Sequence, residues 1–416
     1  MPLERLVEER DGALNNFDLI RLVAATLVLV SHAFPLSGDK RAVAEPLSLW
    51  TNGQDTFGGL AVCAFFFISG FLVTRSLTRG KSLVAFTVAR ALRILPGLAV
   101  VVILAALVLG PLTTTLSLSD YFAHPGFSAY FRNIHLEMNY NLPGVFSQNA
   151  LNAVNGSLWT LRFEVVMYIA LPFVLWTAGR SSRLILPVFL LALIGVHQLG
   201  LASPAKGIQF FYYVHLGQFF LAGVIAYMYR DIIRLSMPLA MVCLGIVLAT
   251  AVLGGFYLSR VIAGSYLLLW FAYGAPKAPE VFTRHGDLSY GIYIYAFPAQ
   301  QLVAETCEWG KTWQGNIALA LPLTFLLAYL SWRFVEAPAL RRRSAVLGML
   351  APLQNRMRNL SLAFGRSPWV RLFERAAMDR AALGRRSAGR NARLRFFPAR
   401  AQVRARHPDA PQQPPH

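Results

Sequence analysis

An arginine and a histidine interrupt the first apolar stretch of this 416-residue chain, in the segment DLIRLVAATLVLVSHAF. Arg21 and His32 are eleven residues apart, and in an α-helix eleven residues turn through about 1100°, or three turns plus about 20°. The two side chains therefore share one helix face, about 16 Å apart along the axis. Because a histidine can serve as a general base and ionisable residues are costly to bury in a membrane, the pair predicts a function. Taken singly, Arg21 could instead reach lipid headgroups and His32 could end a helix before Pro35.

A second basic pair occurs in FTVARALRILPG, where Arg90 and Arg93 are three residues apart and share a helix face. Arginine is the preferred bidentate partner of phosphate groups, so the pair is suited to a donor that carries several phosphates. Alternatively, both arginines only mark the cytoplasmic end of a membrane span, and their position alone supports this explanation about as well as phosphate binding.

A carboxylate interrupts the fourth apolar stretch, in NGSLWTLRFEVVMYIALP. Glu164 follows Ser157 by less than two helical turns, which places it on the outer side if this stretch runs inward. We therefore expect Glu164 at the depth of His32, where a carboxylate would fix the tautomer of the imidazole and support its basicity. The alternative partner is Arg162, although side chains two residues apart on a helix point nearly opposite ways.

The composition requires that membrane helices position these side chains. Hydrophobic residues make up 56% of the chain and charged residues only 14%, against roughly 25% charged residues in soluble domains. The sequence thus predicts an all-α polytopic membrane protein, a bundle of about ten transmembrane helices of about 20 residues each. The expected spans are 17–35, 57–75, 84–110, 158–178, 184–201, 208–229, 236–255, 258–273, 288–304 and 315–335. The seventh and eighth, separated by Tyr257–Arg260, could instead form one hairpin that enters from the outer face.

The basic charge is concentrated in the C-terminal tail. The formal net charge is +19, and from Arg341 onward 17 arginines face three acidic residues, which gives +14 there and +5 for residues 1–340. The predicted organisation is a cytoplasmic N-terminus (1–16), a membrane domain (17–340) and a basic, partly disordered cytoplasmic tail (341–416). We expect the tail to adhere to anionic membrane lipids and not to bind nucleic acid, because no aromatic platform or binding fold accompanies the charge.

The loops predict an orientation with both ends in the cytoplasm, since short cytoplasmic loops retain Lys and Arg. With the N-terminus inside, the inner segments before the tail carry eleven Lys or Arg residues and the outer loops, Arg260 among them, carry six. The outer connection 111–157 is far longer than usual. Its polar and aromatic content fits a carbohydrate-facing lid or an ordinary structured loop. Cys63, Cys243 and Cys307 lie far apart without metal-type spacing, so neither a metal site nor a disulfide framework is expected.

Taken together and in order, these motifs resemble the acyltransferase 3 family of integral membrane acyltransferases over residues 15–340. The chain departs from the family pattern at Ala296, where family members often carry a histidine. The resemblance rests on the Arg21–His32 pattern, FFFISGFLV (Phe65 to Val73), the Arg90–Arg93 pair, SLWTLRFEVVMY with Glu164, LSYGIYIYAFP (Leu288 to Pro298) and FVEAP (Phe334 to Pro338).

The resemblance implies a membrane O-acyltransferase of the bacterial inner membrane. It would move an acyl group, most simply acetyl, from cytoplasmic acyl-CoA to a hydroxyl of an exported or lipid-linked saccharide. His32 would act as general base or carry the acyl group transiently, with Glu164 orienting it. Arg21, Arg90 and Arg93 would bind the CoA phosphates, and Ser157, Trp159 and Tyr168 the substrate, without a metal.

Two other functions are compatible with the pattern. One is a transporter of a polysaccharide or lipid-linked intermediate, in which Arg21 and His32 gate or couple protons. The other is a non-catalytic partner of a polysaccharide synthase, which would tolerate loss of His32. Neither accounts for the full set of motifs as economically, and the sequence does not determine the oligomeric state.

Overall fold

A computed structural model describes residues 1–10, 15–38, 44–80, 82–279 and 286–352 of the chain. These residues form helices joined by turns and loops, with two isolated β-bridges and no sheet among them, which confirms the predicted all-α class. Most of the predicted basic tail, residues 353–416, lies outside the described residues.

The helices follow the expected spans closely, with short helices added at the N-terminus, between α2 and α4, and in the long connection 111–157. In the first half of the chain they are α1 (Leu3–Glu9), α2 (Phe17–Leu36), α3 (Pro46–Trp50), α4 (Phe57–Arg79), α5 (Leu83–Leu104), α6 (Gly110–Thr113), α7 (Leu118–Ala123) and α8 (Pro125–Tyr130). In the second half they are α9 (Trp159–Ala178), α10 (Ser182–Gln198), α11 (Ile208–Met228), α12 (Met237–Leu253), α13 (Phe256–Ser259), α14 (Ser265–Leu269), α15 (Ser289–Thr306), α16 (Trp313–Ser331) and α17 (Ala337–Arg341).

Among the described residues, seven helices are long and apolar enough to cross a membrane. They are 17–36, 57–79, 83–113, 156–178, 208–228, 256–274 and 313–352. The polytopic architecture is therefore confirmed, whereas the expected count of about ten is not. Helices α10 and α12 are apolar but only 17 residues long, and α15, which buries nearly all of its side chains, is not among the seven.

The seventh and eighth expected spans are two separate helices joined by a tight glycine turn. Gly254 and Gly255 have φ values of +100° and +86°, a backbone conformation that side chains disfavour, so the chain reverses within two residues. The next helix consequently begins at Phe256, and Arg260 lies inside it. The assignment of Arg260 to an outer loop was thus wrong: its side chain is only 4% exposed and forms an ion pair with Asp55.

Helices α4 and α11 approach each other closely through a reciprocal pair of glycines. A Cβ on Gly70 of α4 would lie 2.0 Å from the carbonyl oxygen of Phe220, and a Cβ on Gly223 of α11 would lie 2.1 Å from that of Phe67. Small residues let helix backbones meet in this way in membranes, where packing must replace the hydrophobic drive between helices. This contact fixes the rotation and depth of α4, which carries Ser69 beside Gly70.

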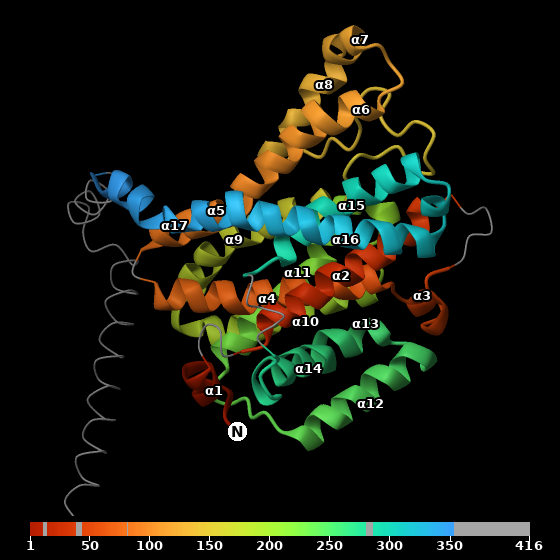
Figure 1. The fold of residues 1–416 in the computed structure, drawn as a ribbon. Helices are drawn as coiled ribbons and strands as arrows, with labels where there is room; N and C mark the ends of the chain where they lie inside the picture. The colour runs from red at the N-terminus through yellow and green to blue at the C-terminus, as the bar shows by residue number, and fades with distance from the viewer. Residues whose placement is uncertain (11–14, 39–43, 81, 280–285, 353–416) are drawn as a thin grey trace, which may run out of the picture. The chain divides into compact units, whose positions relative to one another are not determined.

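Helices α2, α4, α15 and α16 lie side by side in the bundle (Figure 1).

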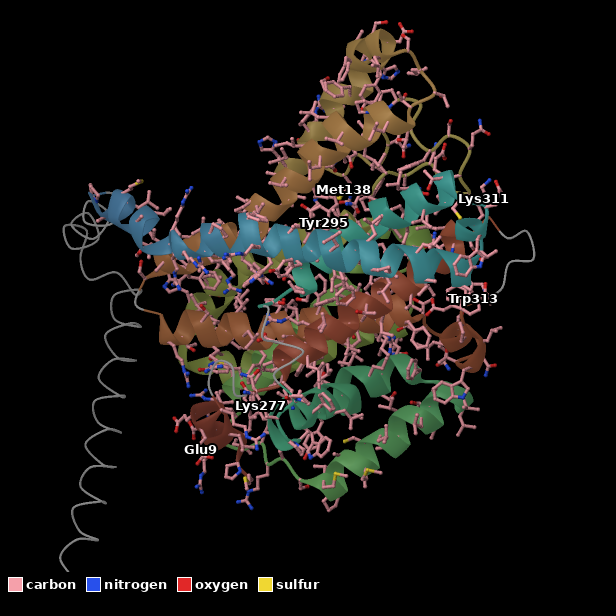
Figure 2. The ribbon with its side chains drawn as sticks, in the orientation of Figure 1. Glu9, Met138, Lys277, Tyr295, Lys311 and Trp313 are labelled. Atoms are coloured by element: carbon pink, nitrogen blue, oxygen red, sulfur yellow. The ribbon has the colours of Figure 1, made fainter. Side chains whose placement is uncertain are left out.

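The N-terminal residues attach to the connection between α11 and α12, where the backbone N–H of Leu3 donates to the carbonyl of Ile233 at 2.8 Å. Figure 2 shows Glu9 toward the left of this view and Lys311 and Trp313 at the right end. The N-terminus and the α11–α12 connection therefore share one end of the bundle.

Candidate functional site

A cavity opens between helices α2, α4, α5, α9 and α15, and most of the candidate residues line it. Its lining combines charged and hydroxyl side chains with aliphatic and aromatic ones. The polar lining residues are Arg21, Ser69, Arg90, Arg93, Thr160, Glu164, Tyr168, Ser289, Tyr290 and Tyr293, and the apolar ones include Val62, Phe65, Phe66, Leu72, Ile94 and Leu161.

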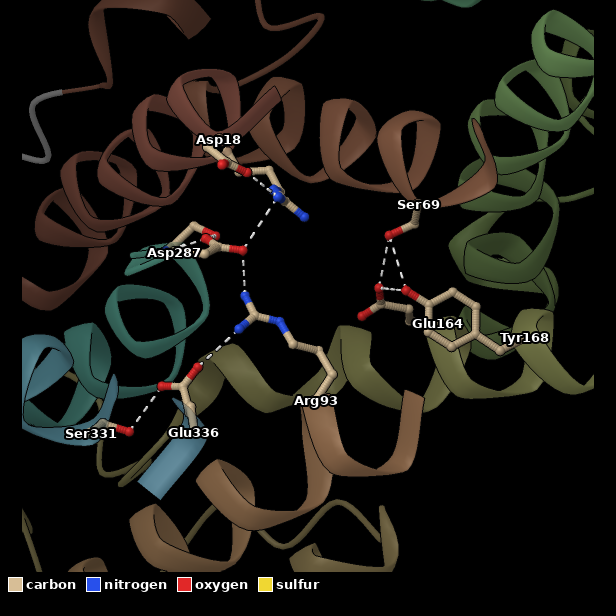
Figure 3. A network of polar contacts seen from close by, with 10 residues as sticks. Asp18, Ser69, Arg93, Glu164, Tyr168, Asp287, Ser331 and Glu336 are labelled. Atoms are coloured by element: carbon tan, nitrogen blue, oxygen red, sulfur yellow. Dashed lines mark hydrogen bonds and ion pairs between the residues drawn. The ribbon is translucent and has the colours of Figure 1, made fainter. Parts of the chain in front are cut away.

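Arg93 is held by two carboxylates from distant parts of the chain (Figure 3). Its guanidinium lies 2.6 Å from Asp287 Oδ2 and 3.2 Å from Glu336 Oε2. Glu336 is 1% exposed, and its second oxygen accepts a hydrogen bond from the hydroxyl of Ser331 at 3.0 Å. With two carboxylate partners, Arg93 is largely neutralised where it stands.

Arg21 joins the same network, because its guanidinium pairs with Asp18 on its own helix and lies 3.3 Å from Asp287. Asp287 thus bridges Arg21 and Arg93. Burial alone would raise the pKa of the Asp287 carboxyl, but the two guanidiniums and the Ser289 hydroxyl outweigh it and hold the pKa well below its usual value. The carboxyl stays ionised and holds both arginines close to the N-terminal end of α15.

Asp287 and Glu336 were not among the residues predicted from the sequence. Each nevertheless sits at a quoted motif, since Asp287 directly precedes LSYGIYIYAFP and Glu336 lies within FVEAP. Their distance from Arg93 along the chain, 194 and 243 residues, left no local pattern that would link them to it.

Arg90 differs from the other two arginines of the cavity. It makes no ion pair with any carboxylate of the described residues, and its buried Nε has no hydrogen-bond partner among them. Its guanidinium lies 5.9 Å from the centre of the Tyr168 ring. Arg90 therefore has no carboxylate partner among the described residues and has unused donors that an anionic ligand could take.

Glu164 lies opposite these arginines and collects two hydroxyl groups (Figure 3). Ser69 Oγ donates to Glu164 Oε1 at 2.8 Å, and the hydroxyl of Tyr168 donates to the same oxygen. Tyr168 lies one turn further along α9, so Glu164 holds its ring beside Arg90. Of the residues predicted to bind substrate, Tyr168 is the one that lines the cavity.

His32 does not lie in the cavity and does not contact Glu164. Its ring packs edge-on against Phe297 at 5.2 Å between ring centres, and its buried Nδ1 has no hydrogen-bond partner among the described residues. Phe297 follows Tyr293, which lines the cavity, by one turn of α15. His32 therefore contacts a residue one turn of α15 away from the cavity lining, and neither His32 nor Phe297 lines the cavity.

The expected pairing of Glu164 with His32 fails because the two residues lie at different depths. Gly58 of α4 packs against Ser31, the neighbour of His32, since a Cβ on Gly58 would meet Ser31 Oγ at 2.8 Å. Ser69, which holds Glu164, comes eleven residues later on the same helix, about 16 Å deeper. Glu164 therefore belongs to the level of the arginines and not to that of His32.

Ser157 and Trp159, the other predicted substrate residues, lie outside the cavity lining. Ser157 is fully buried, and its carbonyl accepts a hydrogen bond from Tyr293 Oη at 2.7 Å. Trp159 packs against Tyr212, with 4.2 Å between the ring centres. Both residues therefore make packing contacts at the start of α9, Ser157 with α15 and Trp159 with α11.

Comparison with known proteins gives consistent results over nearly the whole membrane domain. A family model described as an acyltransferase domain matches residues 14–335. The chain is 31% identical over 345 residues to a protein of Shigella phage Sf6 named O-acetyl transferase, covering 80% of this chain and 98% of that protein. It is 30% identical over 375 residues to nodulation protein 10 of Rhizobium leguminosarum bv. viciae, covering 82% and 97% respectively. No solved structure matches.

Proposed function

The chain belongs to the acyltransferase 3 family and is an O-acyltransferase embedded in a membrane, and from this premise we propose its donor, its acceptor and its chemistry. The donor is cytoplasmic acyl-CoA, most simply acetyl-CoA. The acceptor is a hydroxyl of an exported or lipid-linked saccharide, and the membrane is the bacterial inner membrane.

The proposal rests on Arg90, which lines the cavity without a carboxylate partner among the described residues. A cavity arginine with no carboxylate partner among the described residues is suited to a phosphate group, because a guanidinium donates two parallel hydrogen bonds to it. Arg21 and Arg93 add positive charge at the same level, although Asp18, Asp287 and Glu336 offset it. We therefore assign the closest phosphate contact to Arg90 and supporting contacts to the other two.

Acyl transfer then needs a base for the acceptor hydroxyl, and we assign this role to His32. The imidazole takes the hydroxyl proton while the oxygen attacks the thioester carbonyl carbon. The carbon–sulfur bond breaks, and the thiolate of CoA leaves and takes the proton from the imidazolium. Because His32 does not line the cavity and Phe297 packs against its ring, we propose that the Phe297 ring turns aside during this step. Glu164 is a positioning residue that holds Tyr168 beside Arg90.

The proposal can be tested by mass spectrometry of surface glycans and lipids from cells with and without the protein. An acyl mass increment that depends on the protein would identify acceptor and acyl group together. Purified protein in vesicles with labelled acetyl-CoA then separates the alternatives: a transporter moves its cargo without a donor, and a non-catalytic partner transfers no label.

Replacing Arg90 with lysine is expected to raise the apparent KM for acyl-CoA about tenfold, which corresponds to ~1.4 kcal/mol. Lysine keeps the charge that fixes the topology but loses the planar fork that binds phosphate. Steady-state kinetics with varied acyl-CoA would measure the change. Arg333→Lys, at an exposed arginine outside the cavity, is the matched control and should leave KM unchanged. Equal KM values for wild type and Arg90→Lys would reduce Arg90 to a topology signal.

We further propose that both termini are cytoplasmic, as the basic residues of the loops indicate. Burial of Arg260 supports this orientation, because it removes one of the six outer basic residues from the loops. In a variant without Cys63, Cys243 and Cys307, an impermeant thiol reagent outside the cell should label a cysteine at Ser147. It should not reach one at Ser387, and labelling in the reverse pattern would reject the orientation.

A further inference from the structure

Helix α5 does not stop after one membrane crossing. It continues without a break through a π-helical turn (Ala105–Leu109) into α6, so that residues 83–113 form one helix of 31 residues. At 1.5 Å per residue this helix is about 46 Å long, against about 30 Å for the hydrocarbon core of a bilayer. Figure 1 shows α6, α7 and α8 at its far end, standing away from α2, α15 and α16. We call residues 105–123 the arm.

The arm has the composition of a membrane segment. From Ile94 to Ser119 the chain runs for 26 residues without a single Asp, Glu, Lys or Arg. That is longer than the roughly 20 residues that one span requires. A lid that worked in water would have no reason to avoid charge over the whole of this length.

The apolar side chains of the arm point outward. Leu112 is 77% exposed, and the other exposed side chains of the arm are Leu107, Val108, Leu116, Leu118 and Phe122. This surface continues from Ile103 and Leu104 of α5, which are exposed on a helix that crosses the membrane. An exposed apolar surface of this extent is expected to be shielded from water. On α5, a membrane-spanning helix, lipid shields it.

The polar side chains of the arm differ along its length: Ser117, Ser119 and Asp120 near its tip are exposed, whereas those beside the π-helical turn have internal partners. Tyr121 is fully buried, and its hydroxyl donates to the carbonyl of Ala106 at 2.7 Å, within the π-helical turn. Gly110 makes room for this ring, since a Cβ there would lie 1.9 Å from the Tyr121 oxygen. The hydroxyl of Thr113 likewise donates to the carbonyl of Leu109. Internal partners for polar groups are what a segment surrounded by hydrocarbon needs.

We infer that the arm lies in the bilayer, with Leu112 and Phe122 against the acyl chains of phospholipids and the exposed Asp120 at the level of the headgroups. The long outer connection is then not a lid in water over its whole length, and its first part extends the lipid-facing surface of α5. This inference is independent of the proposed reaction and of the proposed orientation, since it concerns only what surrounds residues 105–123.

Fluorescence quenching in vesicles tests the inference on the full-length protein. In the cysteine-free variant, bimane is attached to a single cysteine at Leu112, at Ile103 or at Ser147, and the protein is placed in vesicles of phosphatidylcholine with or without brominated acyl chains. Ile103 is the lipid-facing reference, and Ser147 is an exposed polar control on the same connection. We expect brominated lipid to quench Leu112 as strongly as Ile103, and aqueous iodide to quench only Ser147.

Iodide quenching at Leu112 equal to that at Ser147 would place the arm in water and overturn the inference. Protection of Leu112 from both quenchers would overturn it as well, because the arm would then be covered by protein. Native-like thermal unfolding of each labelled variant in detergent shows that the fold is intact, and no readout depends on acyl transfer. Failure here would leave the proposed function untouched, and failure of the transfer assay would leave this inference untouched.

Discussion

Replacing His32 with alanine is expected to lower acyl transfer at least about 100-fold, because a general base typically contributes 10²- to 10⁴-fold to the rate. The effect should fall on kcat, since the ring lies outside the cavity proposed to receive the donor and makes no hydrogen bond through its buried Nδ1 to any described residue. The measurement is turnover by purified protein with labelled acetyl-CoA and an acceptor extract.

His135→Ala is the matched control, because this histidine is exposed on the connection 111–157 and does not line the cavity. It should keep full turnover. If His32→Ala retained more than about a tenth of wild-type turnover at equal protein abundance, His32 could not be the base.

Gly70→Ala is expected to destabilise the folded protein severely. A Cβ at this position would lie 2.0 Å from the carbonyl oxygen of Phe220, and a backbone oxygen cannot move aside as a flexible side chain can. Helices α4 and α11 would have to separate, and overpacking of this kind typically costs 1–3 kcal/mol or more. Thermal unfolding in detergent should show a clear drop in Tm, and less protein should reach the membrane.

Gly245→Ala provides the comparison within the same fold. Gly245 also lies inside a helix, α12, but a Cβ there would have nothing within 4 Å. Alanine favours helix over glycine, so this variant should be as stable as the wild type or slightly more so. Equal Tm values for Gly70→Ala and Gly245→Ala would show that α4 and α11 are not held at the distance described.

The membrane helices could be predicted from the sequence because apolar runs of about 20 residues leave few other structures possible. Shared helix faces were equally readable, and Arg90, Arg93 and Glu164 do line one cavity. The depth of each residue was harder to predict. Glu164 was placed by counting from Ser157, which was taken to lie at the outer surface.

That starting point failed because the segment before α9 enters the bundle before the helix begins. Val154, Asn155 and Ser157 are buried, and a Cβ on Gly156 would meet the ring of Phe297 at 2.6 Å. The first residues of α9 thus start from inside the protein, so counting turns along the helix misjudges the depth of Glu164. Only the tertiary packing of this loop, which no local pattern encodes, determines it.

The position of Phe297 also affects whether water can compete with the saccharide for the acyl group. Water is a smaller and far more abundant nucleophile than any saccharide, and a base beside a thioester would activate it as readily as a sugar hydroxyl. The ring of Phe297 packs against His32 on one side and close to Gly156, and His32 does not line the cavity. Under the proposed function, the base is thus separated from a thioester in the cavity until this ring moves. Hydrolysis of the donor then needs the same ring movement as transfer to the acceptor. A site in which only the bound acceptor moved this ring would protect an energy-rich donor by induced fit.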